Sequence, residues 1–182
     1  MANLSKILVI SILFFGEWSV YRPDDNSFTI EVPGKYELST DTISTELGMI
    51  PVTLIHHRCK LDNYCFHDDP HSIYAMVHMD YPIGTFPADS TEMINAFLDE
   101  TIENRRTEIG EDTILDYQAD LDQDDYHGRI VRYTSPSRKA LCKAKFIIYD
   151  DRLIALQVVS DKKQIQRKEV RQFLDSFRPN DK

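Results

Sequence analysis

The sequence has few glycines and no long hydrophobic run. Six glycines in 182 residues leave few places where the backbone could cradle a phosphate. The chain also lacks a glycine-rich phosphate loop, a G-x-S-x-G nucleophile elbow and an H-E-x-x-H helix. We therefore expect a protein that is not an enzyme, although a hydrolase with a dispersed active site stays open as an alternative.

Basic residues are the minority charge. Lysine and arginine total 21 against 30 aspartate and glutamate residues, which gives a formal net charge of −9. A protein that neutralises phosphates needs a basic face, so this balance argues against nucleic acid as a general partner. It also argues against adhesion to anionic lipid, and we expect at most peripheral or leader-mediated membrane association.

The amino-terminal residues have the pattern of a signal peptide. Lys6 precedes an apolar stretch over residues 7–15, which is far short of the roughly 20 residues that span a bilayer. No A-x-A cleavage pattern follows. We predict a hydrophobic leader over residues 1–16, one domain over residues 17–179, and export to the periplasm or the outside, with the leader either removed or kept as an anchor. The alternative is that the leader is a buried first strand or helix.

The chain has three cysteines. Cys59 and Cys65 flank the turn-forming run Leu61-Asp62-Asn63, and in an exported protein they are predicted to form a disulfide. A loop of this size would stabilise the fold by roughly 2–3 kcal/mol. Cys142 alternates with small residues in its segment and is predicted to be a buried, inert thiol.

Hydrophobic periodicity predicts strands in runs, with two helices inserted among them. One helix is expected over residues 89–107, with Asp89 as N-cap and Glu92 completing a capping box, and a second from Asp161 to Pro179. The predicted strands are residues 17–21, 28–32, 41–48, 50–60, 73–79, 109–117, 126–133, 139–149 and 153–159. This order predicts an α+β fold, a twisted antiparallel sheet of about six to eight strands with helices on both faces.

Two segments resemble a known family. They are Phe28-Thr29-Ile30-Glu31-Val32-Pro33-Gly34 and the run over residues 152–159, followed by a helix that ends Phe173-Leu174-Asp175-Ser176-Phe177-Arg178. Together they resemble the PsbP/Mog1-like domains, which include small exported bacterial proteins. The resemblance implies an α/β/α sandwich and a non-enzymatic assembly or partner-binding role, and it carries over no functional residue.

Residues 56–71 are rich in histidine, cysteine and aspartate. The order Cys59, Cys65, His67, His71 does not have the spacing of a Cys2His2 zinc site. A loop site of His67, Asp69 and His71 could hold zinc or copper, since imidazole and carboxylate suit either ion. A solvated polar loop is the alternative, and we expect no cofactor.

Charge is segregated between residues 108–125 and 129–145. The first stretch has eight acidic and no basic residues, and the second has six basic and no acidic residues. Opposite charges on neighbouring strands would pair across the predicted hairpin at about 0.2–1 kcal/mol each. Alternatively, the basic residues form a docking patch for an acidic protein. Its members would be Arg129, Arg132, Arg138, Lys139, Lys143 and Lys145, with Lys162, Lys163, Arg167, Lys168 and Arg171 converging on them.

The sequence thus leaves two functions open. The first is an exported, non-catalytic domain that binds a protein or small ligand on one face of its sandwich. The second is a metal-binding protein that uses residues 56–71.

Overall fold

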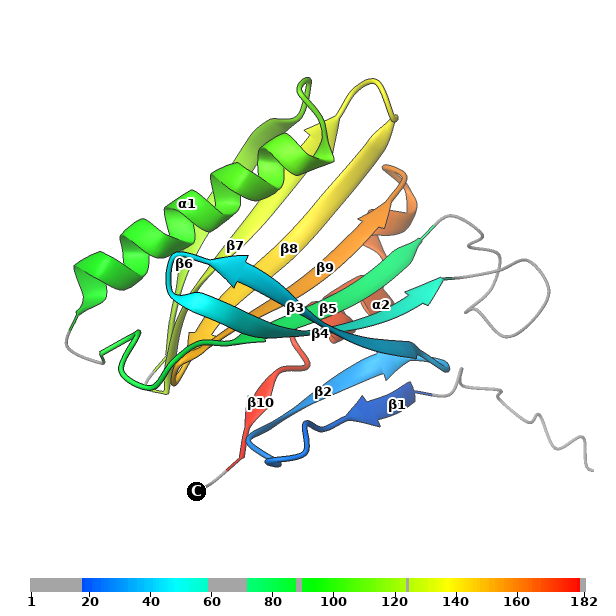
Figure 1. Cartoon of the computed structure of the whole chain (residues 1–182). Coiled ribbons are helices and arrows are strands. Elements are labelled where there is room, and N and C mark those ends of the chain that lie inside the picture. Colours follow the sequence, from blue (N-terminus) through cyan, green and yellow to red (C-terminus); the bar gives the residue numbers. More distant parts are fainter. Residues whose placement is uncertain (1–17, 59–71, 88–89, 124, 181–182) are drawn as a thin grey trace, which may run out of the picture.

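The computed structural model describes residues 18–58, 72–87, 90–123 and 125–180. Within these residues, two antiparallel sheets are packed together with helices (Figure 1). The larger sheet has seven strands in the order β3-β4-β5-β9-β8-β7-β6, and the smaller has the order β1-β2-β10. The predicted antiparallel sheet is therefore confirmed.

The element bounds are as follows. The large sheet consists of β3 (Glu37–Thr45), β4 (Gly48–Arg58), β5 (Ile73–Asp80), β6 (Ile114–Gln123), β7 (Tyr126–Ser135), β8 (Ala140–Tyr149) and β9 (Arg152–Ser160). The small sheet consists of β1 (Trp18–Tyr21), β2 (Phe28–Pro33) and β10 (Arg178–Pro179). The helices are α1 (Thr91–Ile109), the 3-10 turn η1 (Gln164–Gln166) and α2 (Lys168–Leu174).

Most pairs in the large sheet join strands that follow each other in the chain. β3 pairs with β4, and β6, β7, β8 and β9 form a continuous meander. The long-range pair is β5 with β9, where Met76 lies opposite Leu156. Two predicted strands have the wrong bounds. The strand expected over residues 109–117 starts at Ile114, because α1 continues to Ile109 and Gly110 ends it. The strand expected over residues 41–48 spans Glu37–Thr45, and Gly48 begins β4 instead.

Helix α1 packs on one face of the large sheet through Ile94, Leu98 and Ile102, which are buried. Its N-cap residue is Ser90, and no side-chain hydrogen bond caps it. The predicted N-cap, Asp89, lies outside the described residues. Met93, which was expected in the apolar stripe, is 44% exposed because it projects beside the contact rather than into it.

The opposite face of the large sheet is covered by the small sheet together with η1 and α2 (Figure 1). The expectation of helices on both faces is not confirmed, because strands provide much of this cover. The predicted single helix from Asp161 is also divided. Asp161 Oδ1 accepts hydrogen bonds from the backbone N–H groups of Lys163 and Gln164, and Arg167, with φ −64° and ψ 154°, separates η1 from α2.

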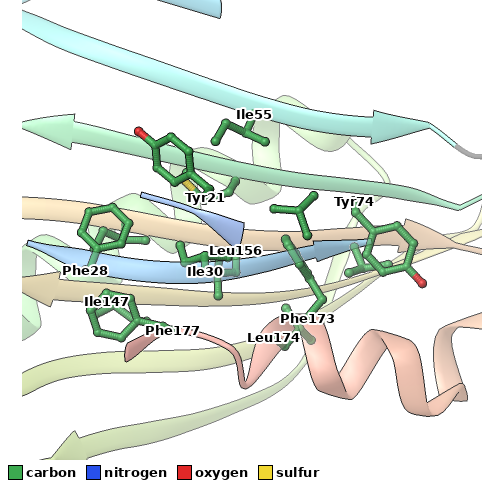
Figure 2. Packing of buried hydrophobic residues seen from close by; sticks show 14 of the residues in the cluster. Tyr21, Phe28, Ile30, Ile55, Tyr74, Ile147, Leu156, Phe173, Leu174 and Phe177 are labelled. Carbon is green, nitrogen blue, oxygen red and sulfur yellow. The ribbon is translucent and has the colours of Figure 1, made fainter. Parts of the chain in front are cut away.

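The two faces have separate hydrophobic cores. On the α2 side, Phe28, Ile30 and Phe177 of the small-sheet layer pack against Ile147 and Leu156 of the large sheet (Figure 2). Phe173 of α2 lies edge-on to Tyr74, with ring centroids 5.5 Å apart. Leu153 and Ala155 alternate with Ile154 and Leu156 along β9 and face the α1 core instead. β9 is thus buried on both faces, as its continuous apolar run predicts.

Two further sequence predictions concern the leader and the thiols. None of the described helices has the length and apolar character needed to span a membrane. Residues 1–16, Cys59 and Cys65 lie outside the described part of the chain. Cys142 is buried, as predicted, and its burial raises the pKa of the thiol to about 11, so it stays protonated and unreactive near neutral pH.

Candidate functional site

A groove lies between strands β6–β8 of the large sheet and the segment that contains η1 and α2. Its volume is about 300 Å³. Its side chains come from β6, β7 and β8 on one side and from η1 and α2 on the other. The lining residues are Tyr117, Ile130, Val131, Arg132, Lys143, Lys145, Gln166, Arg167, Val170, Arg171, Leu174 and Asp175.

The strand register places basic and apolar groups together on the floor of this groove. Arg132 lies opposite Lys143, and Ile130 lies opposite Lys145, across the β7–β8 pair. Side chains two residues apart share one face of a strand, so Lys143 and Lys145 both point toward α2. Ala144 lies between the two lysines and Phe146 follows Lys145, and both belong to the core under α1.

Two of the groove cations already have carboxylate partners. Lys145 Nζ lies 2.9 Å from Asp175 Oδ1, and the lysine side chain is 9% exposed. Arg132 Nε donates to Asp116 Oδ1 at 2.8 Å, and Thr134 Oγ1 donates to Asp116 Oδ2 at 2.6 Å. Burial on its own would raise the pKa of Asp116, but the hydrogen bonds from Thr134 and Arg132 outweigh it and hold this pKa below its usual range.

Lys143 has no carboxylate partner among the described residues. Its Nζ lies 3.4 Å from the amide oxygen Oε1 of Gln166. Burial lowers the pKa of Lys143, and the charges of Arg132 and Arg171 lower it further. The Arg171 side chain is exposed and forms no ion pair or hydrogen bond with the described residues. The centre of the groove thus holds positive charge that the described part of the chain does not neutralise.

The predicted docking patch is divided between the two faces of the sheet. Arg132, Lys143 and Lys145 come together in the groove. Arg167, between η1 and α2, and Arg171 of α2 converge on them, whereas the other predicted members do not line the groove. Arg129 lies on the other face, 6% exposed, where Nη1 is 3.1 Å from Asp120 Oδ1 and Nη2 donates to Asn95 Oδ1 of α1. Arg129 is therefore not part of the patch.

Comparison with solved structures identifies the fold. The structure is similar to the solution structure of cyanobacterial PsbP (CyanoP) from Synechocystis sp. PCC 6803, with a TM-score of 0.56 and 9% sequence identity, over 92% of this chain and 95% of that one. The chain has the PsbP fold. The resemblance seen in the sequence is thereby confirmed for the fold.

A second solved structure is more distant. It is a protein of unknown function from Pseudomonas aeruginosa described as a putative regulator, with a TM-score of 0.42 and 12% identity, over 91% of this chain and all of that one. No family model matches the sequence, and no curated protein matches it.

The predicted metal ligands His67, Asp69 and His71 lie outside the described residues. Among the residues that the structure does describe, no group of three or more histidine, cysteine, aspartate or glutamate side chains is arranged to hold a metal ion. The neighbouring histidines have other partners. His56 Nε2 lies 3.3 Å from Glu37 Oε2, His57 Nδ1 lies 2.6 Å from the carbonyl oxygen of Lys35, and His78 Nε2 lies 3.0 Å from the hydroxyl of Tyr21.

The predicted pairing of opposite charges across the hairpin is present at two places. Asp120 pairs with Arg129 on the α1 side, and Asp116 pairs with Arg132 on the α2 side. Both pairs join β6 to β7, where the acidic and basic stretches lie side by side. Charge pairing and the docking patch do not exclude each other, because Arg132 belongs to both.

Sequence reasoning did not find the apolar part of the groove. Tyr117, Ile130, Val170 and Leu174 come from β6, β7 and α2. One signal was available for Ile130, which lies two residues from Arg132 and therefore shares its face of β7. The irregular register between Leu115 and Tyr117 prevents the same reasoning for Tyr117. No comparable signal places α2 above these strands.

Proposed function

We propose that this protein is an exported, non-catalytic binding domain that holds an acidic segment of a partner protein in the groove between β6–β8 and α2. The observation that carries the proposal is the convergence of Arg132, Lys143 and Arg171 from three elements. Lys143 contacts only an amide oxygen, and Arg171 has no partner among the described residues. A carboxylate between Lys143 and Arg171 would give both side chains a charged hydrogen-bond partner.

The apolar groups beside the cations favour a protein segment over a simple anion. Tyr117 is 51% exposed, and Ile130, Val170 and Leu174 also line the groove. Exposed aromatic side chains next to arginine are the residues that dominate binding energy at protein interfaces. A segment with Asp or Glu beside apolar side chains would satisfy both parts of the groove, whereas a free phosphate would leave the apolar part uncovered.

Export and the absence of catalysis are parts of the same proposal. Export is supported by the leader pattern over residues 1–16. A binding role is supported by the chemistry of the groove, whose polar lining consists of cations, an amide and one carboxylate that is already paired with Lys145. The PsbP-like fold is compatible with this role, but it specifies no ligand.

The test is a binding measurement with a matched pair of variants. A short fluorescein-labelled peptide of alternating glutamate and leucine is titrated with the protein while anisotropy is recorded. We expect saturable binding that weakens as salt increases, and a loss of about tenfold or more in affinity for the double variant Lys143→Gln, Arg171→Gln.

The control removes the same charge outside the groove. Lys162 and Lys163 are exposed and do not line it. The double variant Lys162→Gln, Lys163→Gln should bind the acidic peptide as the native protein does. Equal losses in both double variants would mean that net charge alone attracts the peptide, and the proposed groove would then be wrong. Circular dichroism of each variant establishes that the fold is unchanged.

A further inference from the structure

A second groove lies on the opposite face of the large sheet, beside α1. Its volume is about 550 Å³, which is within the usual range for ligand sites. α1 covers the meander, but it leaves part of β5 and β9 open (Figure 1). The floor of this second groove is formed by Val77, Met79, Phe146, Leu153 and Ala155.

The tip of the β3–β4 hairpin forms the wall opposite α1. Thr45, Glu46 and Leu47 contribute from the hairpin, and Phe97, Glu100 and Thr101 contribute from α1. Leu47 is 55% exposed. Hairpin tips usually have small polar turn formers, so a large exposed apolar side chain at this position serves no evident folding purpose.

The rim of the second groove has unpaired negative charge. The side chains of Glu46 and Glu100 form no ion pair or hydrogen bond with the described residues. The one cation in the lining, Arg105, is already engaged: its Nη1 donates to Glu108 at 2.9 Å and its Nε donates to Gln157 at 2.8 Å. The groove therefore has an apolar floor between two free carboxylates, the reverse of the charge in the groove beside α2.

We infer that the second groove binds an amphipathic protein segment in which lysine or arginine side chains flank apolar ones. The cations would pair with Glu46 and Glu100, and the apolar side chains would cover Met79 and Leu153. A protein segment is favoured over a small organic cation because the two carboxylates come from opposite walls of the groove, and the exposed Leu47 lies beside one of them. This inference concerns a separate surface and does not depend on the proposed function.

The experiment uses the full protein and a short labelled peptide of alternating lysine and leucine, with a glutamine–leucine peptide as the neutral probe. We expect the lysine peptide to bind more tightly than the glutamine peptide. The variant Glu46→Gln, Glu100→Gln should weaken binding of the lysine peptide about fivefold, as for the loss of two exposed charge pairs. The variant Leu47→Ser should weaken the binding of both peptides.

The controls are Glu111→Gln for charge and Ile83→Ser for apolar surface. Glu111 is exposed and does not line the second groove, and Ile83 is 100% exposed and does not line it either. Both controls should bind like the native protein. Three results would overturn the inference. The first is equal weakening in Glu111→Gln, and the second is no binding of the lysine peptide to the native protein at millimolar concentration. The third is displacement of the peptide by dodecyltrimethylammonium at equal affinity. The unliganded protein could also form dimers that the Glu46→Gln, Glu100→Gln variant abolishes. That result would overturn the inference and identify a second copy of the chain as the occupant of the groove.

Discussion

At the first position of β9, the side chain of Arg152 reaches from the large sheet to the small one. Its guanidinium pairs with Asp80 of β5, donates to Ser27 Oγ at 2.5 Å, and lies 3.0 Å from Asp25 Oδ2 in the turn before β2. The same group lies above the Phe28 ring, 5.5 Å from its centroid. One half-buried cation therefore fixes the position of the β1–β2 hairpin on the large sheet.

Replacing Arg152 by methionine should destabilise the protein by about 2–3 kcal/mol. Removing one partner of a fully buried ion pair costs about 3–5 kcal/mol. The cost is smaller here because the side chains of Asp25 and Asp80 are 53% and 38% exposed, and water screens them in part. Urea unfolding at neutral pH measures the difference, and Arg22→Met, an exposed arginine in the same turn, should change stability by less than about 0.5 kcal/mol.

The same variant should flatten the acid dependence of stability. Burial would raise the pKa of both carboxyl groups, but hydrogen bonds outweigh it and hold both pKa values below their usual range. At Asp80 these bonds come from His78 and then Arg152, and at Asp25 from Ser27 and then Arg152. Stability from such depressed carboxyl groups is complete above the unfolded pKa of about 3.9 and is lost as the pH falls through the folded values. An unchanged slope below about pH 4 in Arg152→Met would show that Arg152 does not set these pKa values.

Among the elements, α2 depends most on its surroundings. It has seven residues, fewer than an isolated helix needs to be stable in water. Phe173 is completely buried against Tyr74 of the large sheet, and Val170 and Leu174 are buried beside it. Packing, and not helix propensity, therefore holds α2 over the basic groove.

Phe173→Ala should accordingly lower the free energy of unfolding by about 3–5 kcal/mol, as large-to-small changes in a packed core do. The exposed neighbour Gln172, whose side-chain amide donates to Glu31 Oε2 at 2.8 Å, provides the comparison. Gln172→Ala should cost less than about 1 kcal/mol. Denaturant titration of both variants distinguishes them, and similar midpoints would indicate that α2 contributes little to the core.

At the scale of the whole molecule, the two grooves lie on opposite faces of one sheet. The basic groove is on the α2 side, with Lys143 and Lys145, and the second groove is on the α1 side, with Phe146 between its walls. Neighbouring residues of β8 thus serve different surfaces. Although the net charge is −9, the groove on the α2 side has unneutralised positive charge, and the groove on the α1 side has an acidic rim.

The two grooves should therefore bind their peptides independently. Saturation with the glutamate–leucine peptide should change the affinity for the lysine–leucine peptide by less than about twofold, since the two grooves share no lining residue. The two peptides attract each other in solution. The acidic peptide is therefore first cross-linked to Lys143 through an activated carboxylate, and the affinity for the lysine–leucine peptide is then measured. A large loss of affinity in the cross-linked protein would show that the two faces are coupled.

Local chemistry along the chain determined most strands, the hairpins and the charge pairs of the meander. Alternation and turn residues act over a few positions, and the contacts between β6 and β7 follow from one tight turn, so Asp116–Arg132 and Asp120–Arg129 were within reach of sequence reasoning. The separation of Arg129 from Arg132 was also within reach, because an odd spacing along a strand puts side chains on opposite faces.

Tertiary structure alone decided where the elements meet. The pairing of β5 with β9, the division of the last helix at Arg167 and the position of α2 depend on contacts between residues far apart in the chain. Both grooves depend on these contacts, since each has one wall from a helix and another from strands distant in sequence. A local pattern can indicate which face of an element is apolar, but only the packing of all elements determines which part of that face stays uncovered.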